Sequence, residues 1–249
     1  MTQIEAVKIV MEENGGYATL SHLYKHALKV PGVNWKTKTP DASIRRIVQD
    51  ERYFFKIKPG LWALKSYKDK LPKEVLSLME ISKNPKKEEN INHSYYQGVL
   101  VEWGNILGFE TYVPPQDKNK KYLEKPLIEY VTLKEVYNFT YDSIIRTIKT
   151  IDVIWFNSRK FPEYVFEVEH TTNFQNSLIK FLELQDFSVK MNIVAPKQRK
   201  EEFKDKLSKF AFKPIEERIQ FISYDNLHNW LQKLNRLRPN NWLLNNKPI

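Results

Sequence analysis

Two apolar runs separated by a short polar segment decide the fold of the second half of the chain. Residues 151–156 read IDVIWF and residues 164–169 read YVFEVE, while residues 157–163 between them read NSRKFPE. The runs are rich in β-branched and aromatic residues, and the segment between them has the composition of a turn. This pattern predicts an antiparallel β-hairpin.

The acidic residues of this hairpin are confined to one face. Side chains alternate along a strand, so Asp152 shares a face with Ile154, and Glu167 shares a face with Glu169. Folding about the middle of the turn is expected to set Asp152 opposite Glu169, with Glu167 close by. Three carboxylates in a mostly apolar hairpin repel one another and need a cation. Oxygen ligands of this kind suit Mg²⁺, with Mn²⁺ as the alternative. The competing interpretation is that basic side chains from neighbouring helices neutralise each acid.

The elements around the hairpin predict an α/β core over residues 93–249. A helix with one apolar face is expected upstream, over residues 93–107. Downstream, a helix capped by Asn173, a strand over 191–195, a helix over 198–210, a strand over 219–223 and a helix over 224–234 follow in turn. Such an order is typical of a mixed central sheet flanked by helices.

The hairpin and its surroundings resemble the PD-(D/E)XK nuclease superfamily over roughly residues 93–235. There, an Asp on one strand and a Glu-x-Lys pair on the next flank the metal. Here Asp152 precedes Glu167-Val168-Glu169, so a Glu stands in the usual Lys position. Variants with Glu-x-Glu occur among type II restriction enzymes. The general base is then unassigned, and Glu169, or a water held by it, is the candidate.

The resemblance implies further candidate residues around the acids. Glu102, at the edge of the apolar face of the upstream helix, is expected as an additional metal ligand beside Asp152 and Glu167. His170, Thr171 and Gln175 are candidates for phosphate contacts, because they precede or open a helix whose backbone N–H groups favour anions. Lys180, two turns along that helix, is the candidate to replace the missing cation. For His170, Lys180 and Glu102 the alternative is an ordinary structural or surface role.

Residues 1–67 predict a separate small domain. The Thr2 to Glu5 spacing fits a capping box, Thr19 can cap a second helix, and Thr39-Pro40-Asp41 has the composition of a third helix start. Two β-rich runs around Pro59-Gly60 then predict a hairpin. Three short helices followed by a hairpin make a winged helix-turn-helix. Residues 68–92 are expected to be a linker with a short helix near 71–81 and a polar stretch over 82–90.

The charge of this first domain favours nucleic acid. Residues 30–65 contain eight Lys or Arg against three acids. The third helix and the hairpin offer a set of polar and basic side chains that suits the major groove and flanking phosphates, namely Lys36, Lys38, Ser43, Arg45, Arg46, Gln49, Lys56 and Lys58. A protein-docking module is the alternative. Residues 1–65, and above all 39–44 and 59–64, resemble the HARE-HTH winged helices, which are often fused to restriction-type nucleases and chromatin factors.

Composition limits the function classes that remain. The chain has 249 residues, a formal net charge of +10 and no cysteine, which excludes disulfides, thiolate zinc sites and cysteine nucleophiles. No signal peptide and no membrane-spanning stretch is visible, so a cytoplasmic protein is expected. The sequence thus predicts a Mg²⁺-dependent restriction-type endonuclease acting on double-stranded DNA, with a homodimer expected by analogy. A non-catalytic DNA-binding protein with a decayed core, and an RNA-processing nuclease, are the competing hypotheses.

Overall fold

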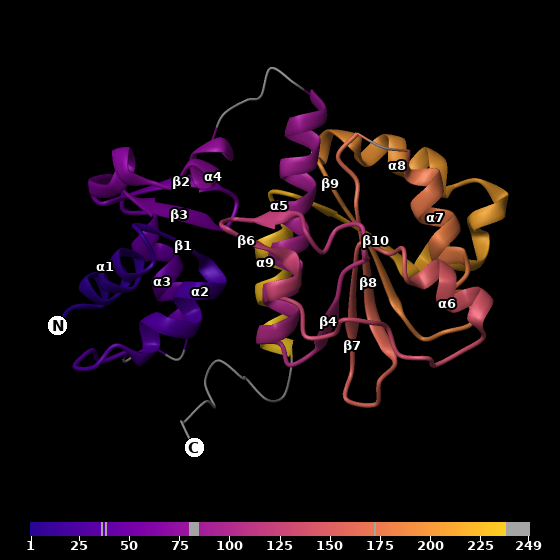
Figure 1. The fold of residues 1–249 in the computed structure, drawn as a ribbon, viewed down its shortest axis with the longest axis horizontal. Coiled ribbons are helices and arrows are strands. Elements are labelled where there is room, and N and C mark those ends of the chain that lie inside the picture. The colour runs from indigo at the N-terminus through magenta and orange to yellow at the C-terminus, as the bar shows by residue number, and fades with distance from the viewer. Residues whose placement is uncertain (36, 38, 80–84, 172, 238–249) are drawn as a thin grey trace. The chain divides into compact units, whose positions relative to one another are not determined.

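The computed structural model describes residues 1–35, 37, 39–79, 85–171 and 173–237, with side chains described from residue 92 in the first long helix of the second unit. The described chain separates into two compact units, residues 1–79 and 85–237. Figure 1 shows the elements of both. Each unit is described by itself.

The first unit contains helices packed on a small three-stranded sheet. Its elements are α1 (Gln3–Glu13), β1 (Tyr17–Thr19), α2 (Leu20–His26), η1 (Ala27–Lys29), α3 (Pro40–Val48), β2 (Phe54–Lys58), β3 (Leu61–Leu64), η2 (Lys65–Lys70) and α4 (Lys73–Ser77).

The helix starts of this unit follow their capping chemistry. Thr2 and Glu5 form the expected capping box, and the Thr19 side chain accepts the backbone N–H of His22. Helix α3 begins at Pro40 as predicted, although Thr39 makes no side-chain cap bond. The predicted hairpin is β2–β3, and its turn places Gly60 at φ 83°, a backbone conformation that favours glycine.

One strand of the first unit was not predicted. β1 pairs antiparallel with β3, so that the sheet order is β1-β3-β2. Its three residues are too few to show an alternation in the sequence. The strand completes the sheet on which α1 and α2 pack, and α3 packs on these two helices, which is the arrangement of a winged helix.

The second unit is a mixed α/β structure. Its elements are α5 (Pro85–Ile106), β4 (Glu110–Tyr112), β5 (Lys121–Tyr122), β6 (Lys125–Pro126), η3 (Leu127–Glu129), α6 (Asp142–Ile148), β7 (Val153–Phe156), β8 (Pro162–Val168), α7 (Phe174–Leu182), β9 (Lys190–Ala195), η4 (Lys197–Arg199), α8 (Lys200–Leu207), η5 (Phe210–Arg218), β10 (Ile219–Ser223) and α9 (Leu227–Leu237).

The central sheet has five strands in the order β10-β9-β8-β7-β4. β8, β9 and β10 run parallel, whereas β7 is antiparallel to both β8 and β4. The carboxyl ends of β8, β9 and β10 therefore lie at the same edge as the amino end of β7. This edge brings together the residues that flank the strands, including Asp152 and Glu169.

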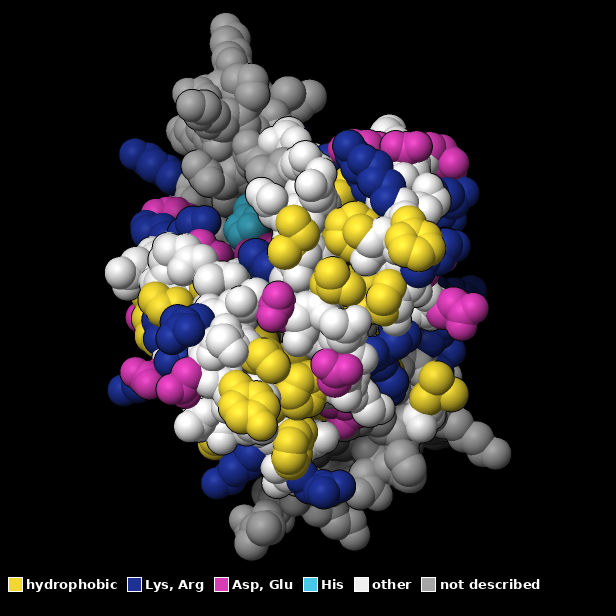
Figure 2. Space-filling view, turned by 90° about the vertical axis from the view of Figure 1, so that its right-hand side faces the viewer, with side chains coloured by type: hydrophobic (Ala, Val, Ile, Leu, Met, Phe, Trp, Pro, Cys, Tyr) yellow, Lys and Arg dark blue, Asp and Glu magenta, His cyan; other side chains and the backbone are white. Residues whose placement is uncertain are grey.

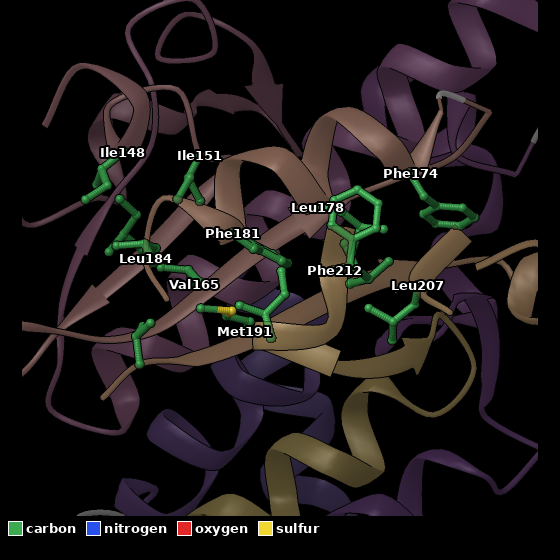
Figure 3. Close-up of a cluster of buried hydrophobic side chains, with 14 of the residues drawn as sticks. Ile148, Ile151, Val165, Phe174, Leu178, Phe181, Leu184, Met191, Leu207 and Phe212 are labelled. Atoms are coloured by element: carbon green, nitrogen blue, oxygen red, sulfur yellow. The ribbon is translucent and has the colours of Figure 1, made fainter. Parts of the chain in front are cut away.

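Helices cover both faces of this sheet (Figure 1). On one face α7 packs through Leu178 and Phe181 onto Val165 and Met191, in a cluster that α6, α8 and η5 complete (Figure 3). On the other face lie α5 and α9, and Trp155 donates a hydrogen bond from Nε1 to the Leu100 carbonyl of α5 at 3.1 Å. The prediction of a mixed central sheet between helices is confirmed.

The helix expected over residues 93–107 begins earlier than predicted. Helix α5 starts at Pro85, so residues 85–90 are helical where the sequence favoured a polar linker; residues 82–84 lie outside the described residues. Proline at the first position and the Lys and Glu residues that follow it are good helix formers, and this local preference prevails over the polar composition.

Hydrophobic side chains remain on the surface of the second unit. Tyr141 is 81% exposed and Phe210 is 89% exposed. Figure 2 shows hydrophobic side chains lying among Lys, Arg and other side chains on the face that stands at the right of Figure 1.

Among the described residues, no helix is long and apolar enough to cross a membrane.

Candidate active site

The three predicted acids meet at the edge of the sheet. Asp152 directly precedes β7, Glu167 lies in β8 and Glu169 directly follows it. All three are buried, with relative exposures of 8%, 2% and 6%. The main-chain N–H of Val168 donates to Asp152 Oδ2 at 2.7 Å, and that of Asp152 donates to Glu167 Oε1 at 3.3 Å. The structure therefore brings the trio together.

The strand register differs from the predicted one. Val153 pairs with Phe166, whereas a pairing of Asp152 with Glu169 requires Val153 to face Val168. The shift is two residues and coincides with a bulge between Trp155 and Phe156. Because the side-chain period of a strand is two, this shift leaves every side chain on its expected face. The acids remain together, but Asp152 lies nearest Glu167.

Helix α7 supplies the groups that hold the two glutamates. Lys180 Nζ lies 3.0 Å and 2.9 Å from the two carboxylate oxygens of Glu167, and it also donates to the Thr150 carbonyl at 2.9 Å. The buried Ser177 hydroxyl contacts Glu167 Oε2 at 3.1 Å and makes a short hydrogen bond with Glu169 Oε1. Lys180 thus stands where the sequence placed a replacement cation, beside the Glu-x-Glu pair.

Burial and mutual repulsion change the acidity of these carboxyls. Burial, and then the charge of Asp152, raise the pKa of Glu167 to about 8 against the opposing effect of Lys180. Burial also raises the pKa of Glu169 to about 7, although the Ser177 hydrogen bond opposes it. Both groups therefore exchange protons near neutral pH, where a general base is most effective.

Two residues that sequence analysis missed, His93 and Asp117, complete the site. His93, on α5, lies with Nε2 at 3.5 Å from Asp152 Oδ1 and at 3.6 Å from Asp117 Oδ2. Its Nδ1 lies 3.0 Å from the Val168 carbonyl. Gln97, one turn along α5, donates to Asp117 at 2.7 Å and to the Asp152 carbonyl at 3.2 Å. Lys120 forms an ion pair with Asp117 at 2.6 Å.

The geometry around His93 fits a metal ligand. Ligand atoms of His93, Asp117 and Asp152 lie within 4.8 Å of one another. A ring N–H directed at a carbonyl fixes the ring orientation and turns Nε2 toward the acids, as is usual for histidine ligands, and a cation that binds there displaces the Nε2 proton. Burial lowers the pKa of His93, but the facing Asp152 and Asp117 outweigh this effect and raise it to about 10. Burial raises the pKa of Asp117, but hydrogen bonds from His93, Lys120 and Gln97 outweigh this effect and hold the pKa well below its ordinary value.

Glu102 is not brought to this cluster. Its carboxylate accepts a hydrogen bond from the Tyr122 hydroxyl at 3.0 Å, on the side of α5 that packs on β5. The apolar stripe of the helix left the direction of an edge residue undetermined. His93 and Gln97, one turn apart on α5, are the residues that the helix directs to the acids.

The remaining predicted auxiliary residues follow the acids along the chain and make other contacts. The His170 ring stacks on Tyr224, with centroids 6.0 Å apart. Thr171 and Gln175 are exposed. The backbone N–H of Gln175 donates a hydrogen bond to the side chain of Asn173, which caps α7 as predicted. Arg199, which was not predicted, donates to the Glu169 carbonyl at 3.3 Å.

The predicted DNA-binding residues of the first unit are partly described. On α3, Arg46 and Gln49 are exposed, whereas Ser43 and Arg45 are half-buried. In the hairpin, Lys56 is exposed and Lys58 is half-buried. Ser43 Oγ lies 3.2 Å from Thr37 Oγ1. Lys36 and Lys38 lie outside the described residues.

Comparison with known proteins identifies the class to which this fold and site belong. Residues 70–239 match the family described as the type II restriction enzyme NmeDI C-terminal domain. The chain belongs to this family. Residues 1–67 match the HARE-HTH family, a helix-turn-helix domain whose description includes restriction endonucleases.

A particular relative is the type II restriction enzyme NmeDI of Neisseria meningitidis serogroup C. The two sequences are 29% identical over 133 residues, which cover 49% of this chain and 37% of the relative. The alignment thus spans little more than a third of that enzyme's length. No solved structure matches the chain significantly. The chain is a restriction-enzyme-like protein with a HARE-HTH domain at its N-terminus.

Proposed function

We propose that the chain is a metal-dependent endonuclease of restriction type that hydrolyses phosphodiester bonds in double-stranded DNA. The observation that carries the proposal is the convergence of His93, Asp117 and Asp152 on one point, directly beside Glu167 and Glu169. Family membership supports the nuclease class. The arrangement also agrees with a PD-(D/E)XK core in which Glu169 takes the usual Lys position.

The residues have distinct roles in this proposal. Asp152, with His93 and Asp117, holds Mg²⁺ or Mn²⁺, and Glu167 faces the same site. A divalent cation there offsets the charge that develops on the phosphate and lowers the pKa of water. A histidine among the ligands favours Mn²⁺ more than an all-oxygen site does. Gln97 and Lys120 fix the orientation of Asp117.

Glu169 is the proposed general base. Its Oε1 is bonded to Ser177, so Oε2 is the atom that accepts the proton of the attacking water. The water oxygen attacks phosphorus, one P–O bond breaks in line, and solvent protonates the leaving oxygen. Lys180 supplies the positive charge that the missing Lys of the PD-(D/E)XK motif would supply, holds Glu167 in place and offsets the charge of the acids.

The first unit contributes recognition. Its exposed Arg46 and Gln49 on α3 and Lys56 in the hairpin suit base and phosphate contacts in and beside the major groove. A homodimer, in which each site cuts one strand, remains a prediction from the analogy with restriction enzymes.

Cleavage of mixed plasmid and genomic DNA, methylated and unmethylated, tests the proposal. The wild type is expected to cut in Mg²⁺ or Mn²⁺ and to stop in EDTA. Asp152→Asn removes one charge at constant shape and is expected to abolish cleavage. The matched control is Glu201→Gln, at an exposed acid paired with Lys204, which is expected to cut normally.

The decayed-core alternative predicts a different result. A protein that only binds DNA would retain binding in every variant and cut none of these substrates. A requirement for a 2′-hydroxyl would instead indicate an RNA-processing nuclease. The alternative of a decayed core is not favoured by the site, because a degenerate site is expected to have lost an acid and all three acids stand together.

A further inference from the structure

Tyr224 lies at the edge of the sheet where the acids converge. It directly follows β10, and its N–H donates to the Ala195 carbonyl at the end of β9, at 3.0 Å. On the other side of β9, the N–H of Glu169 donates to the Val194 carbonyl at 2.9 Å. Tyr224 and Glu169 thus follow two parallel strands that flank the same neighbour.

The ring of Tyr224 stacks on two rings that belong to segments of the site. It stacks on Tyr96 with centroids 3.7 Å apart and an interplanar angle of 15°. Tyr96 lies on α5, between His93 and Gln97. The Tyr224 ring also stacks on His170, which directly follows Glu169, with centroids 6.0 Å apart and an interplanar angle of 6°. These contacts fix the direction of the hydroxyl.

The hydroxyl itself has no hydrogen-bond partner among the described residues, although Tyr224 is only 8% exposed. A buried hydroxyl without a partner is destabilising by about 1–3 kcal/mol, so such groups are rare in stable proteins. Burial, and then the charges of Tyr96 and Glu169, hold the pKa of Tyr224 well above its ordinary value, with Asp152 adding to the effect. The Tyr224 hydroxyl therefore remains a hydrogen-bond donor at neutral pH. It lies near enough to Glu169 and Asp152 for their charges to affect its pKa.

We propose that the Tyr224 hydroxyl is a phosphate-binding group of the active site, which donates a hydrogen bond to a non-bridging oxygen of the phosphodiester beside Asp152 and Glu169. The inference rests on the proposed nuclease function. A phosphate oxygen supplies the acceptor that the protein does not. The bond strengthens as negative charge builds on the phosphate during attack, so the hydroxyl acts mainly on the rate.

Tyr224→Phe tests this role, because it removes the hydroxyl and keeps both ring stacks. The expected result is a single-turnover cleavage rate roughly 10- to 100-fold lower than that of the wild type, the effect of one hydrogen bond to a charged group. The melting temperature of the metal-free protein is expected to equal or exceed that of the wild type, because no partner is lost. Binding to a duplex in Ca²⁺ is expected to change little.

Tyr137→Phe is the matched control. Its hydroxyl donates to Glu110 Oε2 at 2.8 Å, and Glu110 pairs with Phe156 at the end of β7 away from Asp152. This variant is expected to melt at a lower temperature and to cleave at the wild-type rate. The two substitutions thus have opposite signatures in stability and activity.

Two results would overturn the inference while leaving the nuclease proposal intact. One is a Tyr224→Phe rate within about twofold of the wild type, too small for a lost hydrogen bond to a charged group. The other is a fall in melting temperature at least as large as that of Tyr137→Phe, which would indicate a structural hydroxyl. Absence of cleavage by the wild type itself would overturn both proposals. This outcome is distinguishable from the other two, because neither the wild type nor Tyr224→Phe then cleaves DNA.

Discussion

Replacement of Lys180 by Met is expected to destabilise the second unit by an amount that grows with pH. Lys180 Nζ contacts both oxygens of Glu167, whose side chain is 3% exposed, and is itself 24% exposed. Met keeps most of the apolar stem and removes the cation. The variant therefore isolates the effect of the charge on a buried carboxyl.

The sign follows from the pKa of Glu167. This pKa is about 8 in the folded protein and 4.5 ordinarily, so the folded state binds the proton more tightly than the unfolded state. The contribution of Glu167 to stability therefore falls as pH rises from 4.5 to 8. Without Lys180 the folded pKa rises further, and the loss continues above pH 8. At pH 6 the carboxyl is protonated in the folded state of both proteins, and the variant loses only the hydrogen bonds of Lys180 to Glu167 and to the Thr150 carbonyl.

The magnitude can be worked from these values. At about pH 6 the loss is these two hydrogen bonds, about 2 kcal/mol. At about pH 9, roughly one unit above the wild-type pKa, a further loss of about 1.4 kcal/mol is expected. For a unit of this size, these losses correspond to a decrease in melting temperature of roughly 6 °C at the lower pH and roughly 10 °C at the higher one.

Scanning calorimetry of the metal-free protein in EDTA at pH 6 and pH 9 measures this difference. Lys190→Met is the matched control, because Lys190 Nζ donates to a hydroxyl, that of Tyr164, at 2.8 Å and not to a carboxylate. Its effect is expected to be the same at both pH values. An equal loss at pH 6 and pH 9 for Lys180→Met would refute the assignment of the pH effect to Glu167.

Three further outcomes are expected. Gly98→Ala should destabilise the second unit by about 3 kcal/mol or more in a denaturant titration, because the new Cβ would stand 2.0 Å from the Tyr122 ring. The stability of the first unit should fall as pH decreases from 6.5 to 4, because burial lowers the pKa of His22 to about 4, so that protons bind the unfolded chain more readily; an unchanged melting temperature at pH 5 would contradict this. Arg46→Ala should weaken binding to duplex DNA and reduce the salt dependence of log Kd by about one charge, as measured by fluorescence anisotropy at several salt concentrations, and an unaltered slope would remove Arg46 from the interface.

Local sequence patterns were sufficient for much of the fold. The capping box at Thr2, the Pro-Gly turn before Leu61 and the alternation of the β7–β8 hairpin each act within a few residues, and each appears in the structure as predicted. The same alternation put Asp152, Glu167 and Glu169 on one face. The predicted strand register was wrong by two residues, but the three acids still share that face, because an even shift preserves the side on which a residue lies.

The other half of the candidate site could not be read from the sequence. Val168 and His93 are 75 residues apart, and Asp117 lies in a loop with no periodic pattern. No local rule gives the direction of His93 on a helix whose start was itself misplaced. Glu102, which the resemblance made a candidate ligand, accepts a hydrogen bond from Tyr122.

The sequence by itself predicted most of the larger helices and strands and the acidic face of one hairpin, because period, turns and caps are local properties of the chain. The tertiary structure decided which groups meet those acids. The rotation and height of α5 on the sheet depend on the packing of large side chains such as Trp103 and Trp155, which are fully buried. That packing brings His93 to Asp152, and it is a property of the whole core that no single segment encodes.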